Sequence, residues 1–442
     1  MPHLDGNSAT LLNGDPARVS SVHGVFVTEQ RVDEVAFAER FAQIFLTGKF
    51  ASEHFAQFKQ VIRFDWFGWP YFADAAAFDP DDHIRVVRTQ TSKKKMEEII
   101  SESLSTALDM SLPLWNITIF KNFQKTSAVL FKFHHCLADG FSMARILLQG
   151  CELEEMPSAT SSKKGASSSG ASWWTTLSKI PGALAKLLLQ PQDPPSTLKP
   201  ARLMIGSSPR AASWNECKLS ISEMKALGKK TGSFSINDLM FSALCGALRR
   251  FALEKGQVPA RMQTALWVAL TPFRKLYAPV TAKDPIRWGN RKLGCVYTDG
   301  PLEIEDPYER LLEVKKRIRA LIGTPEPFLA SGILKTFGML HKSLLPPIWN
   351  ALAFKTTLSY SNVPGPQTPT KFLGSGIKSL NFYVPPVGTL GLFCTIMSLN
   401  DRATVALSSD ETIVSLEESR LITGTFFNNE MRLLQEAILD RC

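Results

Sequence analysis

The clearest hydrophobic pattern in the chain lies before residue 134, where Val129, Phe131 and Phe133 fall at every second position. A period of two is typical of a β-strand with one buried face. Beyond a short polar stretch, residues 141–149 carry Met, Ile and Leu at helical spacing. The pattern predicts a strand, a loop and a helix, with polar groups gathered where the strand ends. Loops of this kind commonly carry function.

Strand and helix patterns alternate along the rest of the chain. In the first half, strands are predicted at 25–27, 83–84 and 117–120, and helices at 32–46 and 96–108. In the second half, strands are predicted at 213–219, 267–274, 294–298, 392–399 and 405–408, and helices at 222–230, 238–251, 307–322 and 416–438. Such alternation is typical of an α/β fold.

A chain of 442 residues is longer than one ordinary core, so two domains are expected. Residues 1–20 are polar and are predicted to be disordered. Residues 156–200 combine a Ser/Ala/Gly/Lys-rich tract with a proline-rich stretch, which is typical of a linker. Within this linker only an amphipathic segment is expected to be ordered. The predicted domains are therefore 21–155 and 201–442.

Composition limits the classes of function. The net charge of +9 suits anionic partners such as membrane surfaces, nucleic acid or phosphate-bearing small molecules. No nucleic-acid-binding module is recognisable and the basic pairs are dispersed, so no nucleic-acid partner is predicted. The seven cysteines lack paired spacing and no leader pattern precedes the fold. These features favour a reducing compartment without structural disulfides.

Three stretches are rich in apolar residues, although none is long enough to span a bilayer. Residues 63–82 are strongly aromatic and are expected to build core or the wall of a channel. Residues 173–189 place Trp, Leu and Ile on one face with lysines at its border, which is typical of a helix lying on a membrane surface. The alternative is a helix packed on the protein body and broken at Pro181. Residues 344–354 carry the same ambiguity.

The loop after the strand that contains Val129, Phe131 and Phe133 carries four polar or small residues, which are His134, His135, Asp139 and Gly140. Histidine is the side chain whose ordinary pKa lies nearest neutrality, so the pair suits proton transfer. Asp139 could hold an imidazole in one tautomer or pair with a distant arginine, and Gly140 could take a backbone conformation closed to other residues. The alternative is a solvated strand end. A metal site is not favoured, because neighbouring strand residues point to opposite faces and no second ligand motif accompanies them.

Five motifs occur in a fixed order along the chain. They are P-L-W at 113–115, H-H-x-x-x-D-G at 134–140, S-I-N-D at 235–238, the segment 267–274 with G-N at 289–290, and S-N-V-P-G-P at 361–366. At these separations, the chain from about residue 22 onward resembles the bifunctional wax ester synthase/diacylglycerol acyltransferase family of the CoA-dependent acyltransferase superfamily. The resemblance implies an α/β fold of two chloramphenicol-acetyltransferase-like domains with the active site at their interface.

The resemblance also implies roles for the residues of the loop. His135 is expected to be the general base, His134 to support the loop, Asp139 to be structural and Gly140 to allow close approach of the substrate. The segment 267–274 departs from the family's usual proline-valine-serine core but keeps its arginine. Arg274 is the expected partner of Asp139, because a charge-assisted pair between the two halves would fix the loop.

Four further candidates lie in the second half of the chain. Asp238 follows Ser235 at the spacing of a capping box, so its first expected role is to cap a helix. By resemblance, Asn237 is expected to contact substrate or to order the active-site face. Ser361 or Asn362 could donate a hydrogen bond to a developing oxyanion, a hypothesis that rests on the family and on donor chemistry.

The chain contains no G-x-S-x-G elbow, P-loop or dinucleotide fingerprint, so a covalent serine mechanism is not predicted. The resemblance implies direct transfer of a fatty acyl group from acyl-CoA, as co-substrate, to a long-chain alcohol, diacylglycerol or both, without a metal or other cofactor. The alternatives are transfer to another hydroxyl or amine, and lipid binding without turnover. Lipid substrates and amphipathic stretches suggest a peripheral protein on the cytoplasmic face of endoplasmic reticulum or lipid droplets.

Overall fold

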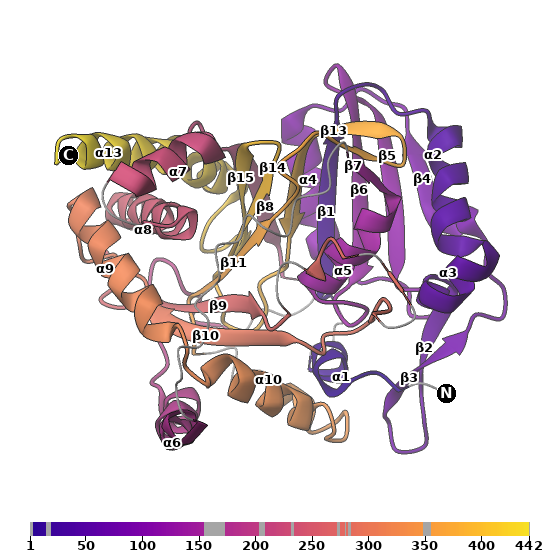
Figure 1. Ribbon diagram of the computed structural model, residues 1–442, viewed down its shortest axis with the longest axis horizontal. Helices are drawn as coiled ribbons and strands as arrows, with labels where there is room; N and C mark the ends of the chain where they lie inside the picture. Colours follow the sequence, from indigo (N-terminus) through magenta and orange to yellow (C-terminus); the bar gives the residue numbers. More distant parts are fainter. Residues whose placement is uncertain are drawn as a thin grey trace.

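The computed structural model describes residues 3–14, 19–153, 173–202, 208–230, 234–271, 275–278, 280–281, 284–347 and 355–441. Two halves, each with its own β-sheet and helices, lie side by side (Figure 1). The prediction of an α/β fold with two sheet-containing halves is confirmed.

The first half is built on a seven-stranded sheet in the order β4-β5-β6-β1-β13-β12-β7. Its strands are β1 (Ser21–Thr28), β4 (Ile84–Val87), β5 (Trp115–Phe123), β6 (Thr126–His134), β7 (Cys151–Leu153), β12 (Thr370–Phe372) and β13 (Ser375–Tyr383). Its helices are α2 (Glu34–Phe41), α3 (Gly48–His54), α4 (Lys93–Leu104) and α5 (Gly140–Leu147), and β2 (Gln60–Phe64) pairs with β3 (Pro70–Asp74) in a separate hairpin. A phenylalanine-rich core fills this half, which explains the apolar alternation in β6.

The second half contains a six-stranded sheet in the order β10-β9-β11-β14-β15-β8. Its strands are β8 (Arg210–Glu216), β9 (Gln263–Ala269), β10 (Leu293–Asp299), β11 (Leu358–Pro364), β14 (Leu392–Leu399) and β15 (Arg402–Asp410). Its helices are α7 (Ile221–Lys230), α8 (Ile236–Glu254), α9 (Pro307–Leu321), α10 (Glu326–Phe337), α12 (Leu416–Leu421) and α13 (Phe427–Leu439). The core of this half surrounds α8, which is buried along most of its length.

The two halves are not divided as the sequence predicted. Strands β12 and β13 come from the C-terminal half of the chain, yet they complete the first sheet by pairing with β7 and β1. The expected unit 201–442 is therefore not a separate body. Strand pairing over this distance leaves no local trace in the sequence. Because β13 pairs with β1 while β14 lies in the second sheet, the connection between them ties the two halves together.

The prediction that residues 1–20 are disordered is wrong for the described part of that segment. Helix α1 (Gly6–Asn13) is capped by Asp5, whose carboxylate accepts the backbone N–H of Ser8. The helix lies at the junction of the two halves and packs beside α10 (Figure 1). Leu12 and several polar side chains of α1 are buried. The prediction from polar composition was wrong, because the side chains of Asn7, Ser8 and Thr10 form hydrogen bonds inside the protein and are not solvated.

The expected linker is also more ordered than predicted. Helix α6 (Trp173–Leu189) continues through Pro181 without a break, and Leu187 packs against the second half while Leu189 is exposed. The proline-rich stretch after the helix was expected to be unstructured, and this is wrong. Asp193 is fully buried and accepts hydrogen bonds from the N–H of Gln263 and the hydroxyl of Thr357.

The aromatic stretch 63–82 departs from the expected core or channel wall at one point. At the tip of the β2–β3 hairpin, Trp66 is 96% exposed, and Phe67 and Trp69 are also exposed. A tight turn fixes them there, because the Asp65 carboxylate accepts the backbone N–H groups of Phe67 and Trp69, both at 2.9 Å. Only the flanking residues, such as Phe72, enter the core.

Candidate active site

The loop with the two histidines lies between β6 and α5 and is held by hydrogen bonds from three neighbouring segments. The N–H of His134 donates to the carbonyl of Leu114 at 2.9 Å, and the N–H of His135 donates to the carbonyl of Ser20 at 2.8 Å. The side-chain amide of Asn290 donates to the carbonyl of His135 at 2.7 Å. Hydrogen bonds therefore hold both the N–H and the carbonyl of His135. The P-L-W motif contributes to this frame through the carbonyl of Leu114.

The two histidines have different surroundings. The ring of His134 is fully buried, and its Nδ1 accepts the backbone N–H of Cys136 at 3.1 Å. That bond makes His134 part of the loop's own frame. His135 instead lines a cavity between the two halves. Of the two imidazoles, only His135 is placed to meet a ligand there.

Burial sets the protonation of the loop. It lowers the pKa of His135 below its ordinary value, although hydrogen bonds that involve its own backbone and the Asn290 side chain oppose this effect. The imidazole of His135 is therefore neutral, and able to accept a proton, over the whole neutral range. Burial also raises the pKa of Asp139 to about 6; hydrogen bonds from Ser142 oppose the rise and the nearby Asp5 carboxylate adds to it.

Asp139 and Gly140 form the start of helix α5. The Asp139 carboxylate accepts the backbone N–H of Ser142 at 2.7 Å and so acts as the N-cap. Gly140 has no unusual backbone conformation, so the expectation that it supplies one is wrong. Instead, a Cβ atom placed on Gly140 would meet no heavy atom within 4 Å. Gly140 thus borders open space beside His135.

The remaining candidates are distributed unequally around this loop. Ser361 lines the same cavity as His135. Asn237 and Asn362 line neither of the cavities described below but contact each other, since the Asn362 side-chain amide donates to Asn237 Oδ1 at 3.0 Å. Asp238 forms the predicted capping box of α8 with Ser235. Arg274, the expected partner of Asp139, lies outside the described residues.

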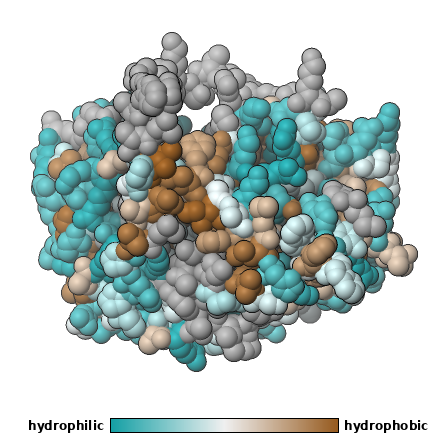
Figure 2. Space-filling model, turned by 90° about the horizontal axis from the view of Figure 1, so that it is seen from below, coloured by the Kyte–Doolittle hydropathy of each residue, from teal (hydrophilic) through white to brown (hydrophobic). Residues whose placement is uncertain are grey.

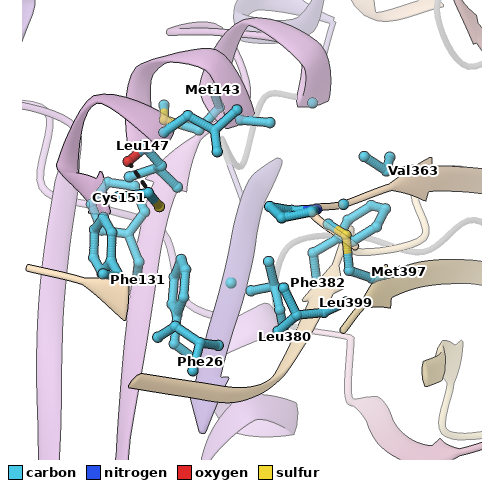
Figure 3. A pocket seen from close by; sticks show the side chains of 18 of the residues that line it. Phe26, Phe131, Met143, Leu147, Cys151, Val363, Leu380, Phe382, Met397 and Leu399 are labelled. Atoms are coloured by element: carbon cyan, nitrogen blue, oxygen red, sulfur yellow. Dashed lines mark hydrogen bonds between the residues drawn. The ribbon is translucent and has the colours of Figure 1, made fainter. Parts of the chain in front are cut away.

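Two cavities meet at the loop between β6 and α5. The first, called the apolar cavity, has a volume of about 890 Å³ including space open to solvent, and Figure 3 shows its side chains pointing inward from β1, β6, α5, β13 and β14. Its walls include Phe26, Phe131, Met143, Leu147, Leu380, Phe382, Met397 and Leu399. Apart from Thr370 and Cys151, it is lined by apolar side chains, glycine and proline.

The second cavity, called the histidine cavity, has a volume of about 1390 Å³ on the same measure. Its lining includes His135, Ser359, Ser361, Thr356, Trp267, Tyr297 and Cys295, together with apolar residues of α1, α6 and α10. Val22, Gly140 and Phe382 line both cavities, so the two spaces adjoin at the start of α5. Two substrates could therefore approach the loop from different directions.

Sequence reasoning did not assign a role to Asn290 and missed Asp5 and Ser8 altogether. The G-N motif at 289–290 signalled that this position mattered, but not that it holds the carbonyl of His135. Nothing in the local pattern could connect Asp5 or Ser8 with a loop that lies more than 100 residues away in the sequence.

Among the described residues, no group of three or more His, Cys, Asp or Glu side chains is arranged to hold a metal ion. In the same part of the chain, no helix has the length and apolarity needed to cross a membrane. The described cysteines are free thiols.

The two-sheet fold, with the H-H-x-x-x-D-G loop facing cavities between its halves, is that of an acyltransferase. The family model for the wax ester synthase/diacylglycerol acyltransferase catalytic domain matches residues 14–253, and the model for the C-terminal domain of the same family matches residues 288–422. The chain belongs to the wax ester synthase/diacylglycerol acyltransferase family, and it is an O-acyltransferase.

Individual relatives are distant. A Mycobacterium tuberculosis protein assigned as a diacylglycerol O-acyltransferase is 26% identical over 373 residues, which cover 77% of this chain and 72% of the relative. Wax ester synthase/diacylglycerol acyltransferase 3 of Arabidopsis thaliana is 25% identical over 311 residues, 63% of each chain. At these identities, the relatives indicate the family of the chain and not its acceptor.

Solved structures confirm the predicted architecture of two chloramphenicol-acetyltransferase-like domains. The wax ester synthase/diacylglycerol acyltransferase of Marinobacter aquaeolei VT8 aligns with 99% of this chain and 100% of its own, with a TM-score of 0.66 and 17% identity. The first condensation domain of the calcium-dependent antibiotic synthetase aligns over 99% of this chain and 96% of its own, with a TM-score of 0.62 and 14% identity. At these identities the likeness concerns the fold.

Proposed function

We propose that the chain transfers a fatty acyl group from acyl-CoA directly to a lipid hydroxyl, with His135 as general base. The observation that carries this proposal is the chemistry of the histidine cavity. Among the described residues that line it, three carry ionisable side chains. Burial raises the pKa of Cys295 to about 12 and that of Tyr297 well above its ordinary value. His135, with a lowered pKa, is therefore the base available near neutral pH.

The reaction needs no covalent intermediate on the enzyme. His135 accepts the proton of the acceptor hydroxyl, and the oxygen attacks the carbonyl carbon of the thioester. Ser361, which shares the cavity, is the proposed donor to the resulting oxyanion. Asn362 is less suited, because its amide already donates to Asn237. The carbon–sulfur bond then breaks, and the imidazolium returns the proton to the sulfur, which leaves an ester and free CoA thiol.

The two cavities suggest where the substrates lie. A saturated acyl tail has no polar atom beyond its thioester, so the apolar cavity suits the acyl chain. The acceptor hydroxyl must reach His135, which places the acceptor in the histidine cavity. Relatives are named for wax ester and diacylglycerol chemistry, so the proposed acceptors are a long-chain alcohol, diacylglycerol or both. Another hydroxyl or amine acceptor is the alternative within the enzymes.

The test is release of free CoA thiol from palmitoyl-CoA by the purified protein, with hexadecanol or dioleoylglycerol as acceptor. Removal of a general base commonly costs about 10²–10⁴-fold in rate, so His135→Ala is expected to lose at least about 100-fold. His54→Ala changes a histidine that lines neither cavity and is the matched control. Acceptor-dependent release of thiol that persists in His135→Ala would refute the role of His135 as general base. Folded wild-type protein that binds lipid but releases no thiol would favour the lipid-binding alternative.

A lipid surface is the proposed site of action, and one face of the molecule suits it. Exposed large apolar side chains belong to α6, α10, the segments beside α10 and the β2–β3 hairpin, elements that lie along one edge of the molecule (Figure 1). They are Leu184, Leu189, Ile322, Phe328, Met339, Leu344, Trp66, Phe67 and Trp69. Figure 2 shows this face, with a large hydrophobic patch left of centre. An exposed apolar patch commonly marks an interaction surface.

Two features favour a lipid surface over a protein partner. Lys179 of α6, Lys335 of α10 and Lys342, which follows α10, are exposed and can meet anionic head groups. In addition, Leu187 of α6 and Ala330 of α10 line the histidine cavity. The elements that would rest on the lipid surface thus also form the wall of the cavity proposed for a lipid acceptor.

Flotation with anionic phospholipid vesicles tests this surface. The double change Trp66→Ser/Phe67→Ser removes two exposed aromatic side chains and is expected to weaken vesicle binding by at least about tenfold. Val35→Ser changes an apolar residue of α2 that is 63% exposed, close to the 65% of Phe67, and that lies away from this face; this variant should bind as the wild type does. Equal vesicle binding by the hairpin variant and the wild type would remove the hairpin from the proposed surface.

A further inference from the structure

The N-terminal helix α1 contacts the frame of the catalytic loop. Asn290 is fully buried, and its backbone N–H donates to Asp5 Oδ2 at 3.1 Å and to Ser8 Oγ at 3.0 Å. Its side-chain Nδ2 donates to the same Ser8 hydroxyl at 3.0 Å. The hydroxyl of Ser8 donates in turn to Asp5 Oδ2 at 2.7 Å. Asn7 completes the contact, because its side-chain amide donates to the carbonyl of Asn290 at 2.7 Å.

The same Asn290 side chain reaches the catalytic loop. Its Nδ2 donates to the carbonyl of His135 as well as to Ser8. Beside it, the N–H of Gly289 donates to the carbonyl of Leu137 at 2.6 Å. Gly289 has φ +93°, and a Cβ atom there would stand 2.0 Å from Asp5 Oδ2. Only glycine therefore allows this backbone to bond the catalytic loop on one side and to admit Asp5 on the other.

We propose that Asp5 and Ser8 are positioning residues, which hold Asn290 and through it the main chain of His135. The proposal rests on the proposed function of His135 and adds to it a segment that precedes the first sheet. None of these residues needs to touch substrate. Their effect is on the placement of the imidazole, because misplacement by about 1 Å at a reacting group can cost about 100-fold in rate.

Helix α1 has its own attachment to the second half, independent of Asn290. The hydroxyl of Thr10 donates to the carbonyl of Leu334 on α10 at 2.7 Å. Gly6 packs so closely on α10 that a Cβ atom there would lie 2.1 Å from the carbonyl oxygen of Lys335. Because α1 is fixed to α10, Asn290 is held from a rigid support. The attachment also supplies a matched control for the loss of a buried hydroxyl.

The experiment compares Ser8→Ala with Thr10→Val in the full chain. Both side chains are fully buried on α1, and each substitution removes one hydroxyl with little change in volume. Both variants are expected to lower Tm, and Ser8→Ala more so, because the Ser8 hydroxyl takes part in three hydrogen bonds and that of Thr10 in one. Ser8→Ala is expected to lower kcat by about tenfold with KM for acyl-CoA unchanged, whereas Thr10→Val should keep kcat within about twofold. Asp5→Asn keeps an oxygen acceptor and should retain more activity than Asp5→Ala.

A selective loss of kcat in Ser8→Ala, with recovery in Asp5→Asn relative to Asp5→Ala, would support the positioning role. Equal losses of kcat in Ser8→Ala and Thr10→Val would overturn it, since they would show only a structural role for α1. Unchanged kcat in Ser8→Ala, or a change confined to KM, would overturn it as well. Failure of the wild type itself to release thiol would refute the proposed function, and the positioning role with it.

Discussion

The two cavities that adjoin at Gly140 differ in the chemistry of their walls. The apolar cavity is formed by strands and a helix of the first half with the ends of β11 and β14, and it offers almost no hydrogen-bonding side chain. The histidine cavity is formed largely by the second half, and it gathers His135, Ser361 and other polar groups among apolar residues. A fold with two cavities of different chemistry can keep two lipid chains apart while their reactive groups meet at one loop.

The difference also explains why the catalytic loop belongs to the first half but faces the second. The alternation in β6 points its aromatic residues into the core and apolar cavity of the first half. The chain then turns at His134, and His135 is the first side chain to reach the other cavity. The proposed base, His135, thus lies at the border between the two spaces, where an acceptor hydroxyl and a thioester would meet.

The largest effect is expected from closing this border. Gly140→Val would place a branched side chain in the open space that both cavities share, while the absence of any heavy atom within 4 Å of its Cβ should let the protein fold. Because reacting groups must approach to about 3–3.5 Å, acyl transfer is expected to fall by at least about 100-fold. Thiol release and a thermal melt measure the two effects. A Gly140→Val variant with ordinary turnover would show that the substrates do not meet there.

The pH dependence sharpens the assignment of the base to the histidine cavity. His135 must be neutral to accept a proton, and burial lowers its pKa. The decline of activity at low pH should therefore have its midpoint below the ordinary value of 6.5, and well below that midpoint activity should fall by about tenfold for each pH unit. The measurement is kcat against pH at saturating substrate, with circular dichroism to show that the protein stays folded. A decline centred above pH 6.5 would contradict the neutral buried imidazole.

A smaller effect is expected at Asp139, which supports the border without lining either cavity. If its role is to cap α5, asparagine can replace it, because both residues are good N-caps. Asp139→Asn should then keep kcat within about threefold, while Asp139→Ala should lower the free energy of unfolding by about 1 kcal/mol. Urea unfolding and thiol release measure these changes. Loss of activity in Asp139→Asn with normal stability would instead favour the charge pair predicted with Arg274.

Local patterns predicted the parts of the molecule that are locally determined. The alternation before residue 134 predicted β6, and the spacing of Ser235 and Asp238 predicted a capping box that the structure confirms. The two-domain architecture came from the order of the motifs and is confirmed by the solved structures. For the catalytic loop, the sequence predicted a strand end with two histidines, but the separate surroundings of His134 and His135 depend on tertiary packing.

The errors occur where distant segments meet. Residues 1–20 are polar, and no local rule could show that Asp5 and Ser8 would bond Asn290. Strands β12 and β13 could not be assigned to the first sheet, because pairing with β7 and β1 depends on partners far away in the sequence. The prediction that the aromatic residues of the hairpin are buried was wrong for the opposite reason. Aromatic residues are usually buried, and here the Asp65 turn holds Trp66 outside.

The central claim, that the two cavities bind different substrates, is tested most directly by filling each in turn. Gly24 lines the apolar cavity, and a Cβ atom there would stand 3.6 Å from the Phe26 ring, an ordinary contact. Ala330 lines the histidine cavity. The measurement is kcat/KM of Gly24→Val and Ala330→Leu across acyl-CoA donors and alcohol acceptors of increasing chain length.

Gly24→Val is expected to shift donor preference toward shorter acyl chains by about tenfold and to leave acceptor preference unchanged, because one methylene in a pocket is worth about 1–3 kcal/mol. Ala330→Leu is expected to shift acceptor preference and to leave donor preference unchanged. If both variants altered the preference for the same substrate, the assignment of acyl chain and acceptor to separate cavities would be contradicted. If Gly24→Val altered acceptor preference and Ala330→Leu altered donor preference, the assignment would be contradicted as well.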